Sequence, residues 1–279
     1  MKKYIDLHTH STASDGSLTP GGLVKHAKEC GLSAISLTDH DTIDGVEEAL
    51  AHGEALGIEV IPGVEISADF KLEMHILGYF SKLKYKNMHK TLSSLRESRE
   101  KRNPKIVNKL REMGFDISME EVRQEAFGEI VGRPHIAKVM VKKGFVSSIH
   151  EAFDKYLSIG RPAYFKKNKL TPKECIKEIL NAGGVPVLAH PVMLGMNFQE
   201  LDDTLASLKK DGLMGIETYY VENSPEDTDC LVKLADKYDL IKTGGSDYHG
   251  SFKPDIEIGK GYGNLCVPYE VLEKLKSFL

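Results

Sequence analysis

The chain has 279 residues, of which 41% are hydrophobic and 28% are charged, and its formal net charge is −4. This composition excludes wholesale disorder, and the length suits one large α/β barrel or two domains of ordinary size. No apolar run approaches the roughly 20 residues of a membrane span, and the amino terminus lacks a signal peptide's apolar stretch, so we expect no membrane association. Four separated cysteines without a C-x-x-C pair favour reduced, mostly buried thiols and a cytoplasmic location.

Seven short apolar runs, rich in β-branched residues, predict strands along the chain. They lie at 4–7, 34–38, 59–64, 75–77, 185–189, 215–218 and 240–243. Helix-period segments separate most of these runs, which predicts a parallel sheet that is either open and doubly wound or closed as a barrel. Only about ten residues separate the third run from the fourth, too few for a crossover helix, so we expect a hairpin or an irregular link there.

The ends of several helices are marked in the sequence. Thr19 is a suitable N-cap for a helix over 18–30, and Gly31 follows its end. The segments 46–56 and 225–238 have the same helical spacing of apolar residues. A further helix is expected to begin after Thr171, because Glu174 completes the spacing of a capping box.

The middle of the chain differs from both ends. Residues 82–169 contain 21 Lys and Arg against 10 Asp and Glu, whereas the rest contains 16 against 31. From about 88 to 157 there is no strand pattern, and the spacing of apolar residues predicts four or five helices. We therefore predict an all-helical insertion over 82–165 in an α/β host formed by 1–81 and 166–279. The basic unit is suited to attracting an anion and the acidic unit to holding cations.

Histidines and acids follow the ends of the predicted strands. His8 and His10 are two residues apart at the end of the first run, so both imidazoles can point to one side and converge on an ion. Asp247 and His249 repeat this spacing after the seventh run. In a parallel barrel such positions line the catalytic face. Taken along the chain, the candidate metal ligands are His8, His10, Asp15, His40, Glu65, His75, His190, Asp247 and His249.

Nine nitrogen and oxygen ligands exceed what one ion uses, because tetrahedral to octahedral sites take four to six donors. The count therefore fits two or three ions with a bridging carboxylate. Imidazole and carboxylate ligands without cysteine favour Mn²⁺, Fe²⁺ or Zn²⁺. Asp6, Asp39 and Asp41 could orient the ligating imidazoles, or could equally cap loops.

These motifs together resemble those of the polymerase and histidinol phosphatase (PHP) superfamily. The resemblance covers essentially the whole chain and rests on His8-Thr9-His10, Thr38-Asp39-His40-Asp41, Gly63-Val64-Glu65, His75, Ala189-His190-Pro191 and Gly245-Ser246-Asp247-Tyr248-His249. It implies a distorted seven-stranded, TIM-like β/α barrel with a trinuclear metal centre.

The resemblance also implies how the ligands are shared among three ions. One ion would take His8, His10, Glu65 and Asp247. A second would take Asp15, His40 and His249, and a third would share Glu65 and add His75 and His190.

Within this superfamily, the insert is similar to one branch through Gly132-Arg133-Pro134-His135 and Gly160-Arg161-Pro162-Ala163-Tyr164. That branch contains nucleoside 3′,5′-bisphosphate phosphatases and 5′-to-3′ exoribonucleases acting on short oligonucleotides. The resemblance thus implies a phosphatase or phosphodiesterase whose substrate is a small phosphorylated nucleotide or a short oligonucleotide, with no long duplex nucleic acid as partner.

Clustered divalent ions can activate water, polarise phosphoryl oxygens and stabilise a leaving alkoxide, so a metal-bridging hydroxide is the expected nucleophile. The absence of a G-x-S-x-G elbow and of a P-loop agrees with such a mechanism. We assign catalytic roles to His190, His249 and Asp247, with either histidine as the candidate general acid.

Recognition of a second phosphate is assigned to the insert, because arginine bonds phosphate through a planar fork and stays charged. We rank Arg133 first and Arg161 second, followed by Arg102, Lys166 and His135. The remaining charges of 96–102 are expected to form a salt-bridged solvent face.

Three other interpretations stay open. Histidinol-phosphate phosphatase uses the same chemistry, although one phosphomonoester does not require so basic an insert. A barrel amidohydrolase also begins with H-x-H, but such enzymes commonly use a carboxylated lysine on the fourth strand, where 73–78 has none. The third is a metal-stabilised binding module, against which the full set of nine ligands argues, since structural sites close with four.

Overall fold

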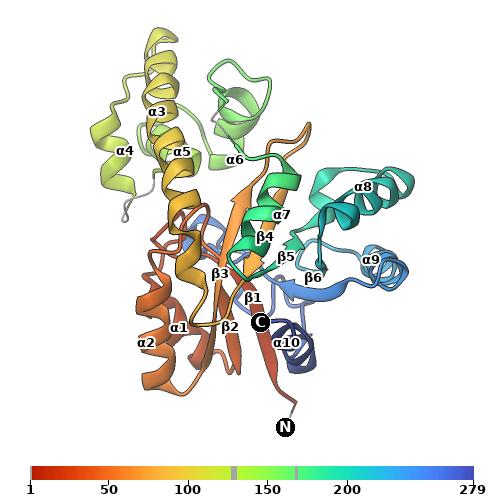
Figure 1. The fold of residues 1–279 in the computed structure, drawn as a ribbon. Helices are drawn as coiled ribbons and strands as arrows, with labels where there is room; N and C mark the ends of the chain where they lie inside the picture. The colour runs from red at the N-terminus through yellow and green to blue at the C-terminus, as the bar shows by residue number, and fades with distance from the viewer. Residues whose placement is uncertain (1, 127–130, 167–168) are drawn as a thin grey trace.

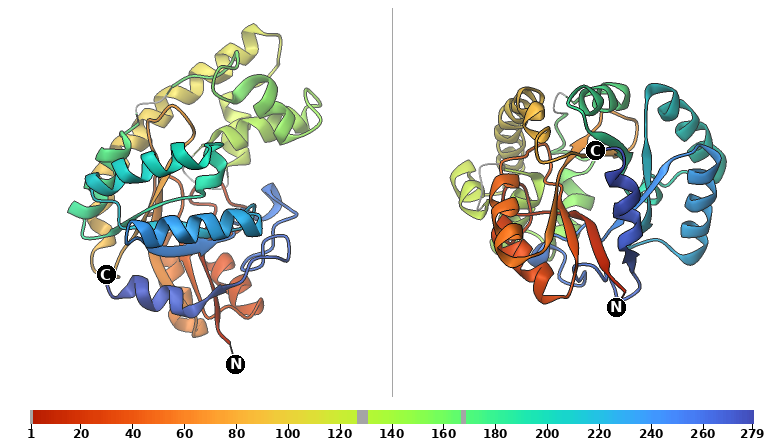
Figure 2. Two further views of the ribbon diagram at one scale, coloured as in Figure 1. Left: turned by 90° about the vertical axis from the view of Figure 1, so that its right-hand side faces the viewer. Right: turned by 60° about the horizontal axis from the view of Figure 1, so that its bottom comes forward.

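The computed structural model describes residues 2–126, 131–166 and 169–279. Its centre is a nearly closed, barrel-like sheet of eight strands with helices on the outside (Figures 1 and 2). In chain order, the strands are β1 (Tyr4–Thr9), β2 (Ala34–Leu37), β3 (Glu59–Ser67), β4 (His75–Tyr79), β5 (Val185–Leu188), β6 (Gly215–Tyr220), β7 (Ile241–Gly245) and β8 (Val267–Pro268).

The strand order is β7-β6-β5-β4-β3-β2-β1-β8. Pairing is parallel within β1-β2-β3 and within β5-β6-β7, whereas β4 runs antiparallel to both β3 and β5. The predicted hairpin between the third and fourth strands is therefore confirmed. The expected number of seven strands is wrong, because β8 adds an antiparallel partner to β1. The strand β8 consists of two residues, one of them proline, and so short a strand gives no alternating pattern in the sequence.

The sheet nearly closes where its edge strand β7 approaches β1, the neighbour of the other edge strand β8. An isolated parallel bridge joins Thr9 to Tyr248, and the His10 backbone N–H donates to the Tyr248 carbonyl at 2.9 Å. This approach requires a glycine in β7, since a Cβ on Gly245 would lie 2.4 Å from the Cβ of His8. The residues that follow β1 and β7 are consequently neighbours.

Helices on the outside of the sheet are α1 (Pro20–Glu29), α2 (Val46–Leu56), α7 (Pro172–Asn181), α8 (Phe198–Asp211), α9 (Pro225–Lys237) and α10 (Tyr269–Lys276). The Thr19 hydroxyl caps α1 by accepting from Gly22, and Thr171 and Glu174 form the expected capping box at α7. Apolar side chains of α1, α2, α7, α8 and α9 pack with the sheet in one cluster, and those of α10 pack with it in a second. Among the described residues, no helix has the length and apolar character needed to cross a membrane.

The middle of the chain is helical, as expected, and lies beyond one end of the sheet (Figure 1). It contains the turn η1 (Tyr85–Met88), the helices α3 (His89–Glu112), α4 (Met119–Glu125), α5 (Arg133–Lys142) and α6 (Ile149–Ala152), and the π-helical turn η2 (Phe153–Leu157). The first half of α3 packs on the sheet's cluster through Leu92 and Leu95, and its second half joins a separate cluster. The domain boundaries at 82 and 165 stay a prediction.

All four cysteines are free thiols. Cys175 is buried as expected, but Cys266 is exposed and the other two are half-buried, so the expectation of mostly buried thiols is wrong.

Candidate metal centre

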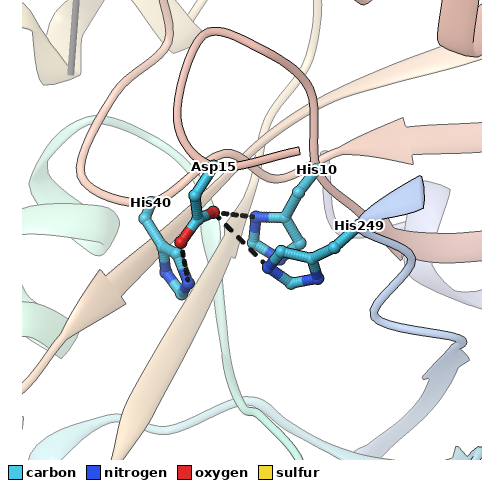
Figure 3. A group of neighbouring side chains, drawn as sticks. All are labelled: His10, Asp15, His40 and His249. Carbon is cyan, nitrogen blue, oxygen red and sulfur yellow. Dashed lines mark ion pairs between the residues drawn. The ribbon is translucent and has the colours of Figure 1, made fainter. Parts of the chain in front are cut away.

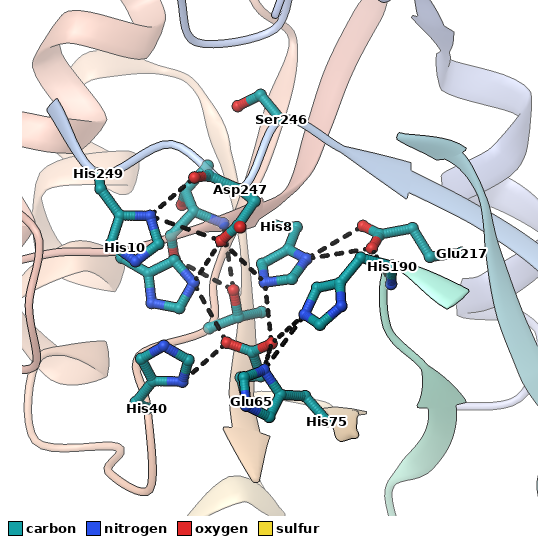
Figure 4. Close-up of polar contacts among 12 residues, drawn as sticks. His8, His10, His40, Glu65, His75, His190, Glu217, Ser246, Asp247 and His249 are labelled. Atoms are coloured by element: carbon teal, nitrogen blue, oxygen red, sulfur yellow. Dashed lines mark hydrogen bonds and ion pairs between the residues drawn. The ribbon is translucent and has the colours of Figure 1, made fainter. Parts of the chain in front are cut away.

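Nine imidazole and carboxylate side chains meet at one end of the sheet, and we call them the acid–imidazole cage (Figure 4). Eight lie near the carboxyl end of a parallel strand or in the loop that follows it, because parallel strands bring these ends to the same edge, and His75 lies at the start of the antiparallel β4. Most are buried, and His40 and His75 are half-buried. The members of the cage are His8, His10, Asp15, His40, Glu65, His75, His190, Asp247 and His249.

One group within the cage joins β1, β3 and the loop after β7. His10 Nε2 lies 3.1 Å from Asp247 Oδ1 and 3.4 Å from Glu65 Oε2. His8 Nε2 lies 3.5 Å from Asp247 Oδ1 and 3.5 Å from Glu65 Oε1. These four ligand atoms could hold one ion. The grouping is the one that the resemblance implies for the first metal.

A second group surrounds Asp15, in the loop after β1 (Figure 3). The carboxylate lies 3.4 Å from His249 Nε2, 3.8 Å from His40 Nε2 and 3.8 Å from His10 Nδ1. The structure thus adds His10 to the three ligands implied for the second ion.

A third group is built on Glu65. Its Oε1 lies 2.8 Å from His75 Nδ1 and 3.0 Å from His190 Nε2, and these two nitrogens are 3.2 Å apart. Its Oε2 lies 2.8 Å from His40 Nδ1. Because each oxygen of Glu65 faces different imidazoles, this carboxylate is placed to bridge neighbouring ions.

Unpartnered polar atoms show that the cage fits divalent metal ions. His8 Nε2, both ring nitrogens of His10 and Glu65 Oε2 are buried without a hydrogen-bond partner among the described residues. Burying such atoms unpaired costs about 1–3 kcal/mol each. Coordination of a cation satisfies imidazole lone pairs and carboxylate oxygens together, and the donor set of imidazoles and carboxylates suits a transition metal.

The charges of the cage also fit metal binding. Burial opposes ionisation of Glu65, but His40, His75 and His8 hold the pKa of this carboxyl well below its usual range. Burial and the neighbouring His249 lower the pKa of His10 to about 3. Glu65 and His10 are therefore in the protonation states that bind metals. Burial opposes a charge on His40, but Glu65 and Asp15 outweigh burial and raise the pKa of His40 to about 9, so this imidazole has to release a proton when a metal ion binds.

Backbone conformation is unusual at the cage. Within the described residues, only Asp41, His190, Asp239 and Asp247 have positive φ without being glycine. Two of them, His190 at 26° and Asp247 at 53°, belong to the cage, and Asp41 at 55° follows His40. Such backbone strain is commonly found at functional sites.

Glu217 is a member of the site that the sequence analysis missed. It is fully buried in β6, with Oε1 at 3.1 Å from His8 Nδ1 and Oε2 accepting from the His190 backbone N–H at 2.7 Å. When His8 Nδ1 carries a proton and donates it to Glu217, Nε2 is left as the metal-binding atom. The sequence signal that could have identified Glu217 is its position as a single acid within an apolar strand.

Asp6, Asp39 and Asp41 were expected either to orient imidazoles or to cap loops, and the following contacts agree with the second role. Asp6 accepts from Ser246 and Gly259, and Asp39 accepts from Ser11 and Ser14. Asp41 accepts from the Ser67 backbone at 3.2 Å and from Arg99 Nη2 at 2.6 Å. These carboxylates fix the loops that carry the cage, which is the alternative role considered for them.

A cavity of about 580 Å³ extends from the cage to the helical segment. Its lining includes three arginines that we call the arginine wall: Arg99, Arg102 and Arg133. Arg99 and Arg102 are each only 7% exposed. The expectation that the remaining charges of 96–102 form a solvent face is therefore wrong for Arg99, whereas Arg102, ranked among the substrate-binding candidates, lines the cavity. Arg99 was not singled out from the sequence.

Two of the predicted substrate-binding residues, Arg161 and His135, are not among the described residues that line this cavity. Arg161 is exposed and pairs with Asp154 at 2.9 Å. His135 is buried, and its Nδ1 accepts from the Gly132 backbone N–H at the start of α5. Both side chains are engaged in local structure, which spacing along the chain does not reveal.

Comparison with known proteins agrees with this site. Residues 6–184 match the PHP domain family. A 5′-3′ exoribonuclease of Haemophilus influenzae is 35% identical over 250 residues, covering 89% of this chain and 91% of that protein. A 3′,5′-nucleoside bisphosphate phosphatase of Chromobacterium violaceum is 30% identical over 260 residues, covering 91% of this chain and 90% of that protein.

Two solved structures, each 29% identical in sequence, cover 99% of this chain and 96% of their own. One, from Bifidobacterium adolescentis, is assigned as a metal-dependent phosphoesterase and superposes with a TM-score of 0.87. The other, an amidohydrolase from Chromobacterium violaceum with bound sulfate, has a TM-score of 0.88. The chain therefore belongs to the PHP domain family and is a metal-dependent phosphoesterase.

Proposed function

We propose that this enzyme hydrolyses nucleotides that carry two phosphates, namely nucleoside 3′,5′-bisphosphates, and short 5′-phosphorylated oligonucleotides. The observation that carries the proposal is the presence of the arginine wall and the acid–imidazole cage in one cavity. One phosphate would lie at the cage and the other at the wall. The names of two relatives, an exoribonuclease and a bisphosphate phosphatase, support the same substrate class.

Arg102 is the arginine whose surroundings most require an anion. Its Nε donates to Asn103 Oδ1 at 2.9 Å, and no carboxylate of the described residues pairs with it. Burial, together with repulsion from Arg99 and Arg133, lowers the pKa of Arg102 to about 9. A buried cation without a counter-ion is costly, and a phosphate would supply the missing charge and accept from the planar fork.

The other two arginines differ in how far the protein already satisfies them. Arg99 binds Asp41, but its Nε is buried with no partner among the described residues. Arg133 donates to Glu73 Oε1 at 2.7 Å and to the Leu157 carbonyl at 3.0 Å. We therefore place Arg102 before Arg133 in binding the second phosphate, with Arg99 beside it.

At the cage, the nine residues would hold two or three ions of Mn²⁺, Fe²⁺ or Zn²⁺. Such ions supply activation of water and stabilisation of charge on the phosphoryl group. The protein's own groups orient these ligands: Glu217 fixes the His8 ring, and Tyr220 donates to Asp247 Oδ2 at 3.2 Å. His190, His249 and Asp247 are proposed as the catalytic residues among them.

The proposal is tested by comparing kcat/KM for adenosine 3′,5′-bisphosphate, adenosine 5′-monophosphate, histidinol phosphate and a 5′-phosphorylated RNA trimer. We expect the bisphosphate or the trimer to be preferred, because only these substrates reach both the cage and the wall. Faster turnover of histidinol phosphate would favour the smaller-substrate alternative. Cleavage of a C–N bond with no phosphatase activity would favour the amidohydrolase, although β4 has no lysine to carry a carboxylate.

A further inference from the structure

Lys253 is a cavity residue that neither the sequence motifs nor the proposed nucleotide recognition uses. It follows the short helix η4 (Gly250–Phe252), which comes after β7. Its side chain lines the cavity and is 37% exposed. Its ammonium nitrogen lies 2.7 Å from Asp247 Oδ2. A cation is thus held at the border between the cage and the space that a substrate enters.

Asp247 lies between the lysine and the imidazole ligands of the cage. Its Oδ1 faces the rings of His8 and His10 (Figure 4). Its Oδ2 accepts from Lys253 and from the Tyr220 hydroxyl. An ammonium has no lone pair, so Lys253 is not itself a ligand. It stands next to the cage, on the carboxylate oxygen that is turned away from the imidazoles.

Lys253 carries a positive charge at neutral pH, because the ordinary pKa of a lysine is about 10.4, and its ammonium pairs with the Asp247 carboxylate. The ammonium has three donors, and the contact with Asp247 occupies one of them. The other two remain for an acceptor in the cavity, and in this enzyme class that acceptor is a phosphate.

We propose that Lys253 is a catalytic residue that donates hydrogen bonds to the phosphoryl group at the cage and stabilises its developing negative charge. A fixed cation aimed at charge that grows in the transition state is among the strongest catalytic contributions. The lysine keeps its proton throughout. The proposal concerns the phosphoryl group common to all substrates, so it does not depend on the nucleotide preference proposed above.

A purely supporting role for Lys253, in which it only holds Asp247 in place, makes different predictions. In that case removing the lysine would disturb Asp247 and lower the amount of bound metal. A direct contact with phosphate would instead change the binding of inorganic phosphate and the turnover of every phosphoester while metal content stays constant.

The experiment compares Lys253→Met, Lys253→Arg and the control Lys260→Met in the metal-loaded enzyme. Lys260 is exposed, in the same C-terminal region, and pairs only with Glu257 among the described residues. For each variant, kcat/KM for p-nitrophenyl phosphate, the inhibition constant of inorganic phosphate, and bound metal by elemental analysis are measured. A simple substrate keeps the result independent of the arginine wall.

We expect K253M to lower kcat/KM and to raise the inhibition constant of phosphate, each by roughly 10–100-fold, the usual range for a charged hydrogen bond. Bound metal should not change, K253R should recover much of the loss, and K260M should behave as wild type. Unchanged phosphate inhibition in K253M would overturn the proposal. So would a fall in bound metal that parallels the loss of activity, since that result assigns Lys253 to support of Asp247.

Discussion

The acid–imidazole cage and the arginine wall share one cavity, but the chain builds them differently. Eight members of the cage lie on strands or within a few residues of a strand end, and Asp15 lies in the loop after β1. The wall comes from two helices, with Arg99 and Arg102 on α3 and Arg133 at the start of α5. The cage is therefore placed by the sheet, whereas the wall is placed by how helices dock above it.

The two regions also differ in how their charges are balanced. In the cage, imidazoles and carboxylates alternate at 2.8–3.8 Å, and their excess of ligand atoms calls for cations. In the wall, Arg102 has no acidic partner among the described residues, and repulsion from Arg99 and Arg133 adds to the cost of its charge. Metal ions would balance the charges of the cage, and an anion would balance those of the wall. Substitutions can therefore abolish the function of one region without affecting the other.

Removing metal should have the largest effect. Glu65 touches imidazoles through both oxygens, so Glu65→Gln removes the proposed bridge while preserving side-chain volume. We expect a fall of about 1,000-fold or more in kcat for every phosphoester, since the metals supply several kcal/mol of transition-state stabilisation. Kinetics after chelation and after re-addition of Mn²⁺ provide the comparison. Appreciable activity in metal-free protein would contradict the assignment of the cage.

Changing the wall should affect only substrates with two phosphates. For Arg102→Gln we expect kcat/KM for adenosine 3′,5′-bisphosphate to fall roughly 10–100-fold, the usual range for a charged hydrogen bond. Hydrolysis of p-nitrophenyl phosphate should stay near wild type. Arg111→Gln, an exposed position on the same helix, is the matched control. An equal loss on both substrates would remove Arg102 from recognition of the second phosphate.

The cage could be predicted from sequence because its pattern is local. Two residues two positions apart at a strand end share a side, so His8 and His10 were assigned from spacing alone. The short separation of two predicted strands, another local feature, located the hairpin between β3 and β4. It did not find β8, whose two residues have no period.

The wall could not be assigned in this way, because the direction of a helical side chain depends on what the helix packs against. Arg99 was expected on a solvent face, yet α3 turns it into the cavity beside Arg102. Arg161 was expected at the substrate and pairs with Asp154 at the surface instead. Glu217 was visible as an acid within an apolar strand, but its partner His8 lies 209 positions away.

A smaller effect on metal binding is expected from substitution of Glu217, which orients the candidate metal ligand His8 from outside the cage. In Glu217→Gln the amide no longer offers His8 Nδ1 a charged acceptor, which weakens the preference for a metal-binding Nε2. Loss of such a partner typically costs about 10–100-fold in metal affinity or activity. Metal titration by calorimetry, with Glu222→Gln on the exposed surface as control, measures it. Unaltered metal affinity would show that the backbone alone determines the orientation of the His8 ring.

The smallest effect concerns the contact that joins the two regions, between Glu73 in the β3–β4 hairpin and Arg133 of the wall. Burial opposes ionisation of Glu73, but Arg133 above all, with His75 and Lys169, lowers its pKa to about 2. The folded pKa lies below the ordinary value of 4.5, so the ion pair stabilises the fold fully above that pH and is lost as pH falls towards 2.

Because Glu73 is half exposed, Glu73→Gln should lower the free energy of unfolding by no more than about 1 kcal/mol at pH 6. The difference from wild type should shrink as pH falls from 4.5 towards 2, measured by denaturant unfolding at matched metal content. A difference that stays constant across this range would mean that Glu73 stabilises the hairpin by packing rather than through its charge. In that case the ion pair that holds the wall to the cage would be the one between Arg99 and Asp41. This pair is more deeply buried than the pair between Arg133 and Glu73.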